Sequence, residues 1–304
     1  MNEYRIKAYA KINLGLDVVR RLENGYHEVK MVMQTVGIYD VLDFERTDGG
    51  IVITTDSGEL PTDENNLIYK AAKLMMETYP ISGGVKIHLE KHIPIAAGMA
   101  GGSTDAAATL KGMNRLFDLR LSLEELKKRG VQLGADIPFC LMRGTALSEG
   151  IGEILTPLPA LPACSIVLAK PAISVSTKAV YENLHVNSLP AEAHPDVDAV
   201  IEALKARDVR AVAGRMGNIL ETVTSRRHPE IEAIKERMME LGALNAMMSG
   251  SGPTVFGIFD DPEKAQTCYQ ALLSAKESGL AKQVYLTEPW QQPSRTTPGR
   301  PARL

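Results

Sequence analysis

The sequence has little cysteine and few aromatic side chains. Three cysteines, Cys140, Cys164 and Cys268, lie far apart among 304 residues, and aromatic residues make up 5% of the chain. Three thiols without metal-ligand spacing indicate neither a disulfide framework nor a zinc site. We therefore expect buried thiols in a reducing compartment.

The sequence also lacks a strong excess of either charge. The formal net charge is -3 and the sequence pI is about 6.1, with the two signs mixed along the chain. A protein that binds RNA or DNA is expected to carry a basic face, and an RNA binder also exposes aromatic residues for base stacking. The composition therefore disfavours a nucleic-acid partner.

Long apolar runs are missing as well. No stretch approaches the length needed to span a membrane, and the first residues, MNEYRIKAYAKINLGLDVV, contain no continuous apolar core of a signal peptide. We therefore expect a cytoplasmic protein without a membrane partner. We expect a small-molecule substrate. The sequence leaves a homodimer open.

The order of patterns indicates an α+β protein. Alternating and β-branched segments predominate in the first sixty residues, and strand and helix patterns are mixed thereafter, without strict βαβ alternation. The run TPLPALP at residues 156–162 suggests a domain connection. We expect domains at residues 1–160 and 161–288 and a disordered tail at 289–304. Helices are expected at 65–79 and from about residues 103, 123, 229 and 262.

One glycine-rich segment points to phosphate binding. PIAAGMAGGSTDAAATL, residues 94–110, follows a strand pattern and precedes a helical pattern. Glycine lets the backbone approach a ligand, and a helix N-terminus favours anions. A plain loop with Ser103 as the helix cap is the structural alternative. The segment is neither a Walker loop nor a Rossmann fingerprint, because both spacings fail.

Two further segments, AKINLGLDV at residues 10–18 and MMSGSGPTVFGIF at 247–259, accompany the glycine loop. Together the three resemble, in order and spacing, the motifs of the GHMP kinases, a family of ATP-dependent small-molecule kinases. The resemblance covers about Tyr4 to Thr287. It implies an N-terminal domain like ribosomal protein S5, a ferredoxin-like C-terminal domain and an active site in the cleft between them.

The resemblance also implies the catalytic residues. Asp136 in GADIPF matches the family's catalytic aspartate, which would accept the proton of the substrate hydroxyl. Lys11 matches the lysine that would keep this aspartate ionised, and Asn13 would bind substrate nearby. Without the other motifs, Asp136 would be interpreted as a helix cap and Lys11 as an exposed strand lysine.

ATP is the implied phosphoryl donor, together with Mg²⁺, for which the resemblance identifies no ligand. The glycine loop would wrap the phosphates, and Asn65 or Asn66 would lie beside adenine, unless either one caps the next helix. Alanine replaces glycine at three positions, 96, 97 and 100, and we expect these alanines to keep negative φ. The ATP-binding residues implied are Asn65, Pro94, Ile95, Ala96, Ala97, Gly98, Met99, Ala100, Gly101, Gly102, Ser103 and Thr104.

Within the family, the best resemblance is to a branch whose alcohol substrate carries a cytidine diphosphate. It rests on NGYHEV, LGADIPFC and LAKPAISVSTKAVY, in addition to the first two motifs. The resemblance implies that Tyr26 and Tyr181 sandwich cytosine and that His27 contacts its edge; otherwise Tyr26 is a surface aromatic and His27 a turn residue. Another alcohol, or a nucleotide-dependent regulator or RNA-binding module on the same scaffold, remains open.

Overall fold

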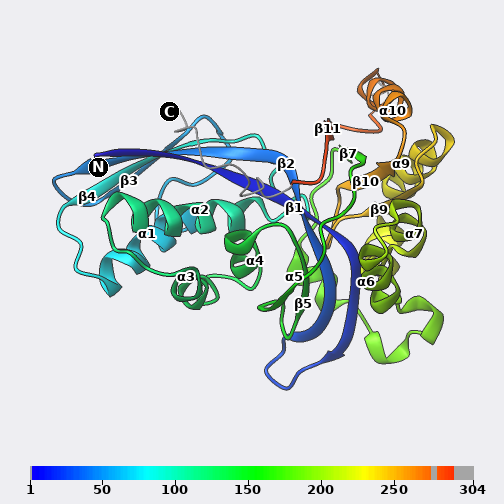
Figure 1. Ribbon diagram of the computed structural model, residues 1–304, viewed down its shortest axis with the longest axis horizontal. Coiled ribbons are helices and arrows are strands. Elements are labelled where there is room, and N and C mark those ends of the chain that lie inside the picture. The colour runs from blue at the N-terminus through cyan, green and yellow to red at the C-terminus, as the bar shows by residue number, and fades with distance from the viewer. Residues whose placement is uncertain (1, 275–278, 291–304) are drawn as a thin grey trace.

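The computed structural model describes residues 2–274 and 279–290, and Figure 1 shows helices packed on two β-sheets. The α+β class is confirmed. The strands are β1 (Glu3–Arg21), β2 (His27–Thr47), β3 (Ile51–Thr55), β4 (Gly84–Glu90), β5 (Thr145–Glu149), β6 (Ile154–Pro157), β7 (Ser165–Lys170), β8 (Gly217–Asn218), β9 (Asn245–Met248), β10 (Val255–Phe259) and β11 (Gln283–Thr287).

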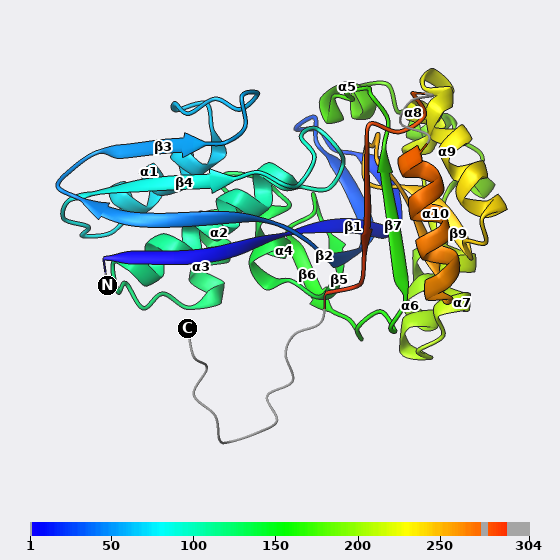
Figure 2. The same cartoon turned by 90° about the horizontal axis from the view of Figure 1, so that it is seen from above.

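The helices of the first half lie against one face of the larger sheet. In that sheet the order is β3-β4-β2-β1-β8, with β5 paired to β2 and β6 paired to β5. Figures 1 and 2 show these helices on one side of β1–β4, where buried residues of α1 and α2 share a core with the strands. They are α1 (Leu67–Thr78), α2 (Gly101–Leu116), α3 (Leu123–Gly130) and α4 (Ile137–Met142).

The smaller sheet has the order β11-β7-β10-β9 and belongs to the second half of the chain. The helices of this half are α5 (Thr177–Glu182), α6 (Val197–Lys205), α7 (Val209–Arg215), α8 (Glu221–Arg227), α9 (Pro229–Glu240) and α10 (Pro262–Ser274). Short 3-10 turns occupy Val186–Ser188 and Ala191–Ala193. Helices α9 and α10 pack on the smaller sheet, as Figure 2 shows.

The long strands β1 and β2 connect the two halves. Fully buried side chains such as Leu42 and Phe44 pack under α1 and α2, whereas Leu16 and Met33 belong to a core that continues into the second half. Strand β8 of the second half pairs with β1 in parallel. We propose that the domain boundary still lies near residue 160, with the β1–β8 pairing as a contact across it.

Helix starts follow the local capping chemistry. Helix α1 begins at Leu67 because the Asn66 side chain accepts a hydrogen bond from the Ile68 amide at 2.8 Å. Helix α3 has the predicted capping box of Ser122 and Glu125. Helix α2 begins at Gly101, with Ala100 in the N-cap position, so Ser103 lies inside the helix and is not its cap.

The end of the chain differs in part from the expectation. Pro289 and Trp290, assigned to the tail, contact β2: Pro289 forms a β-bridge with Val36, and the Trp290 amide donates to the Thr35 carbonyl at 2.9 Å. Residues 291–304 of the predicted tail lie outside the described residues. None of the described helices is both long and apolar enough to cross a membrane.

Candidate active site

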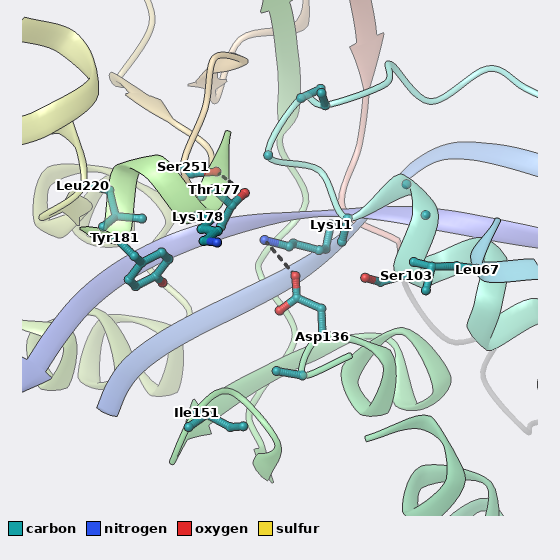
Figure 3. A pocket seen from close by; sticks show the side chains of 18 of the residues that line it. Lys11, Leu67, Ser103, Asp136, Ile151, Thr177, Lys178, Tyr181, Leu220 and Ser251 are labelled. Atoms are coloured by element: carbon teal, nitrogen blue, oxygen red, sulfur yellow. Dashed lines mark hydrogen bonds and ion pairs between the residues drawn. The ribbon is translucent and has the colours of Figure 1, made fainter. Parts of the chain in front are cut away.

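A cavity of about 1030 Å³ collects side chains from distant parts of the chain. Its lining includes the glycine loop, Lys11 of β1, Asp136 before α4 and Tyr181 of α5. In Figure 3, Lys11 and Asp136 face each other near the centre, Ser103 lies on one side, and Tyr181 lies on the other. The cavity therefore has two ends separated by an acid–base pair.

Lys11 and Asp136 form the central pair. The Lys11 Nζ lies 3.9 Å from the Asp136 Oδ2, and the Asp136 side chain is 33% exposed. Asp136 occupies the N-cap position of α4, yet its side chain accepts no capping hydrogen bond. The capping alternative is therefore not realised, and the carboxylate remains available to a ligand. Lys11 is 5% exposed, so it is not a surface lysine.

Asn13 is the hydrogen-bond partner of the Lys11 ammonium. It is fully buried, its Oδ1 accepts a hydrogen bond from the Lys11 Nζ at 2.7 Å, and its Nδ2 lies 3.4 Å from the Met31 Sδ. Asn13 is absent from the cavity lining. This hydrogen bond orients the Lys11 ammonium, and a direct contact between Asn13 and substrate stays a prediction.

The glycine loop supplies a mostly backbone surface. Residues 94–98 and 100–103 line the cavity, but Met99 and Thr104 do not. Met99 is buried in the core, and the Thr104 hydroxyl donates to the Tyr9 carbonyl at 2.7 Å. These two side chains therefore pack behind the loop, and any contact of their backbone with ATP stays a prediction.

Two alanines of the loop depart from the expected backbone. Ala96 has a φ of 50° and Ala100 a φ of 56°, so the expectation of negative φ is wrong at both positions. A Cβ in this region meets the backbone closely, which is why glycine is favoured there. The surrounding contacts impose these angles, since the loop must turn into α2 above β1.

The third motif packs directly on the loop. The Ser249 hydroxyl donates to the Gly98 carbonyl at 3.0 Å, and a Cβ added to Gly98 would lie 2.0 Å from the Ser249 carbonyl oxygen. The Asn218 side chain donates to the carbonyls of Met248 and Gly250 at 2.9 and 2.8 Å. Only glycine at position 98 allows the two glycine-rich turns to meet.

A buried group of charges under the loop was missed by the sequence analysis. Lys91 forms an ion pair with Asp40 and another, of 3.0 Å, with Asp105 of α2, and all three side chains are at most 6% exposed. Burial alone would lower the pKa of Lys91, but the two carboxylates hold it above the usual value. Burial raises the pKa of Asp105 well above its usual value. No periodic pattern links these three positions.

The opposite end of the cavity is aromatic. The rings of His27 and Tyr181 lie 5.2 Å apart with an interplanar angle of 43°, and Tyr26 is 58% exposed. Burial, together with the charge of Arg21, lowers the pKa of His27, so its imidazole is neutral at pH 7. The three residues predicted to bind cytosine all line this end, where Tyr181 packs against His27.

Asn65 and Asn66 both line the cavity. Asn66 also caps α1, and its amide donates to the Pro61 carbonyl at 2.7 Å. Asn65 is exposed and lines the glycine-loop end of the cavity, where its Nδ2 donates to the Asp63 Oδ1 at 3.0 Å. Asn65 thus remains the candidate for a nucleobase contact.

Comparison with known proteins identifies the family. The model of the GHMP kinases N terminal domain matches residues 66–144, and that of the GHMP kinases C terminal matches residues 183–278. The chain belongs to the GHMP kinase family. The match to the N terminal domain includes Asp136 and the whole glycine loop, so the matched range contains the central residues of the cavity.

Relatives within the GHMP kinase family cover nearly the whole chain. A protein of Lachnospira eligens named 4-diphosphocytidyl-2-C-methyl-D-erythritol kinase is 57% identical over 95% of this chain and 99% of its own length. A protein of the same name from Lachnoclostridium phytofermentans is 52% identical over 94% of this chain and 97% of its own.

Solved structures agree with this placement. The crystal structure of a 4-(cytidine 5'-diphospho)-2C-methyl-D-erythritol kinase is 33% identical and superimposes with a TM-score of 0.79, over 95% of this chain and 100% of that chain. A homoserine kinase of Cytophaga hutchinsonii gives a TM-score of 0.78 at 22% identity, over 94% of this chain and 95% of its own. The latter likeness concerns the fold alone.

Proposed function

We propose that this chain transfers the γ-phosphoryl group of ATP to the 2-hydroxyl of 4-diphosphocytidyl-2-C-methyl-D-erythritol, a step of the non-mevalonate isoprenoid precursor pathway. The observation that carries the proposal is the Lys11–Asp136 pair at 3.9 Å between a glycine-loop end and an aromatic end of one cavity. The names and high identity of the relatives select the substrate.

The reaction follows from the groups at the centre. The substrate hydroxyl oxygen attacks the γ-phosphorus, the bond to the β–γ bridging oxygen breaks, and ADP leaves. The hydroxyl proton passes to the Asp136 carboxylate, which acts as general base. Lys11, held by Asn13, orients the Asp136 carboxylate and stabilises negative charge on the reacting oxygens.

The glycine loop would bind the ATP phosphates through the amides of Gly101, Gly102 and Ser103 at the start of α2. The described residues contain no cluster of three His, Cys, Asp or Glu able to hold a metal. This fits Mg²⁺, which is commonly bound by one or two carboxylates and by substrate phosphates. Asp136 and Ser103 are the cavity oxygens that suit it.

At the aromatic end, cytosine would stack on Tyr26 and Tyr181, and the neutral His27 would contact its edge. A cytoplasmic location and any homodimer stay predictions. So does the absence of a nucleic-acid partner.

The test is a turnover assay with purified protein, ATP, Mg²⁺ and one alcohol at a time: the cytidyl-diphosphate substrate, homoserine, mevalonate or galactose. Release of ADP is followed. We expect turnover only with the first alcohol. Turnover with another alcohol would support a different GHMP kinase activity, and no turnover with any would contradict the proposal.

A further inference from the structure

The last described residues form a strap, Glu288–Trp290, across the edge of β2. The Gly37 amide donates to the Glu288 carbonyl at 3.0 Å, and the Trp290 amide donates to the Thr35 carbonyl at 2.9 Å. The strap therefore extends the hydrogen bonding of β2, although it lies far from β2 in the sequence.

The strap sits where the pairing of β1 with β2 changes register. Tyr9 pairs with Tyr39 and Lys11 pairs with Thr35, so Ala10 alone faces residues 36–38 of β2. Such a bulge leaves backbone groups without partners in the neighbouring strand. On its other edge β2 pairs with β5 up to Gln34 and with β4 from Val41, and the strap fills the interval between these two pairings.

The indole of Trp290 holds an arginine against the same strand. The Trp290 ring centroid lies 5.7 Å from the Tyr9 ring centroid and 5.8 Å from the guanidinium carbon of Arg143. The same guanidinium carbon lies 4.9 Å from the Tyr9 ring centroid. Arg143 also donates to the Lys7 carbonyl at 2.7 Å. The Arg143 side chain is thus fixed between β1 and the strap.

Arg143 ends α4, the helix whose N-cap is Asp136. Its backbone has φ 64° and ψ 179°, a conformation that costs about 1–3 kcal/mol outside glycine and persists only where its surroundings impose it. The next residue, Gly144, exchanges hydrogen bonds with Thr35: its amide donates to the Thr35 hydroxyl at 3.1 Å, and its carbonyl accepts from the Thr35 amide at 2.8 Å.

Thr35 is therefore a common anchor. It lies opposite Lys11 in the β1–β2 pair, it binds the residue that follows α4, and its carbonyl accepts the Trp290 amide. Helix α4 is short and rigid, so a shift at its end reaches Asp136 about 10 Å away. We propose that the strap is a positioning element for the reaction and that Trp290 sets the separation of Lys11 from Asp136.

Two variants disturb the strap independently. Trp290→Ala removes the ring that holds Arg143, and Trp290→Phe keeps an aromatic ring there. In Gly37→Ala the new Cβ would lie 2.7 Å from the hydroxyl oxygen of Thr287, the residue before the strap, and 3.6 Å from the Glu288 carbonyl oxygen, so it crowds the point where the strap meets β2. Gly49→Ala is the matched control, because no atom lies within 4 Å of its added Cβ.

The first measurement is the Lys11 Nζ–Asp136 Oδ2 distance in crystal structures of these variants, against 3.9 Å in the parent chain. We expect it to grow by about 1 Å in Gly37→Ala and Trp290→Ala. It should stay unchanged in Gly49→Ala and Trp290→Phe. An unchanged distance in both strap variants would overturn the proposal, whatever the substrate of the protein is.

The second measurement is steady-state kinetics, which rests on the proposed function. A misplacement of about 1 Å can cost as much as 100-fold, so we expect kcat to fall about 10- to 100-fold in Trp290→Ala and Gly37→Ala. Each KM should stay within about twofold, and Trp290→Phe should recover most of kcat. A lower melting temperature with normal kcat would indicate a merely structural strap. A wild type without turnover would contradict the proposed function, while the distance measurement would still decide the role of the strap.

Discussion

At the glycine-loop end of the cavity the lining is mostly backbone and small side chains, whereas the Tyr181 end is built from aromatic rings. The first end is fixed by contacts behind it: Gly98 meets Ser249, and Lys91 is buried between two aspartates. At the second end Tyr26 is more than half exposed. A site for phosphate therefore needs backbone amides held in a fixed conformation, whereas a site for a nucleobase needs side-chain surfaces on which the base can stack.

The largest expected effect lies between the two ends. Asp136→Asn should lower kcat by about 10²–10⁴-fold, because the substituted amide cannot accept the hydroxyl proton. The affinity for an unreactive ATP analogue should stay close to that of the parent, which titration calorimetry measures. Asp198→Asn, an exposed carboxylate paired with Lys30, is the control. Near-normal turnover in Asp136→Asn would remove the general base from the mechanism.

The second-largest effect is expected from removing the buried lysine that supports the glycine-loop end. Lys91→Met leaves Asp40 and Asp105 buried without their cation, and loss of one partner of a buried ion pair costs about 3–5 kcal/mol in unfolding free energy. Urea unfolding checks it. Lys205→Met removes the cation of an exposed pair with Glu202 and should change stability little. Equal effects of the two substitutions would show that the buried charges do not hold this end.

Substitutions at the aromatic end should weaken binding of the cytidine substrate and leave binding of ATP unchanged. Tyr26→Ala or Tyr181→Ala should raise the KM of the cytidine substrate about 10- to 100-fold, because stacking on one ring contributes about 1–3 kcal/mol. The KM of ATP should stay unchanged. His27→Ala should instead reduce the preference for cytidine over uridine, since edge contacts discriminate between bases. Specificity constants for both analogues separate the two roles.

If all three variants keep the affinity and preference of the parent, the cytosine assignment fails. The kinase assignment would survive, because it depends on Lys11, Asp136 and the glycine loop. The aromatic end would then have no assigned ligand.

The smallest effect concerns the strained alanines. Ala96→Gly and Ala100→Gly should each raise the unfolding free energy by about 0.5–1 kcal/mol, because glycine adopts positive φ without strain. Thermal or urea unfolding measures this change. Ala199→Gly, within α6, should have the opposite sign, since glycine weakens a helix interior. Destabilisation by both loop substitutions would show that the positive φ angles cost nothing at these positions.

Sequence reasoning identified the parts of the molecule that local chemistry determines. The capping box at Ser122, the helix start at Pro229 and the turn between β9 and β10 follow from short-range rules. The three motifs also pointed to side chains that the fold gathers in one cavity. The placement of Lys11 opposite Asp136 depended on the family resemblance, because the two lie far apart in the chain.

The remaining features arise from contacts that no local pattern encodes. The ion pairs of Lys91 join residues from three separate elements. Ala96 has a positive φ, against the usual preference of alanine, and no local pattern marks that position. Trp290 falls within the segment predicted to be a disordered tail, yet its partners lie in β1, β2 and the end of α4.

The most direct test of the account is a crystal structure with an unreactive ATP analogue, Mg²⁺ and the cytidyl-diphosphate alcohol bound together. The account predicts the triphosphate along Gly98–Ser103, cytosine against Tyr26 and Tyr181, and the 2-hydroxyl oxygen within hydrogen-bond distance of Asp136. Cytosine at the glycine-loop end, or a 2-hydroxyl that lies away from Asp136, would contradict it.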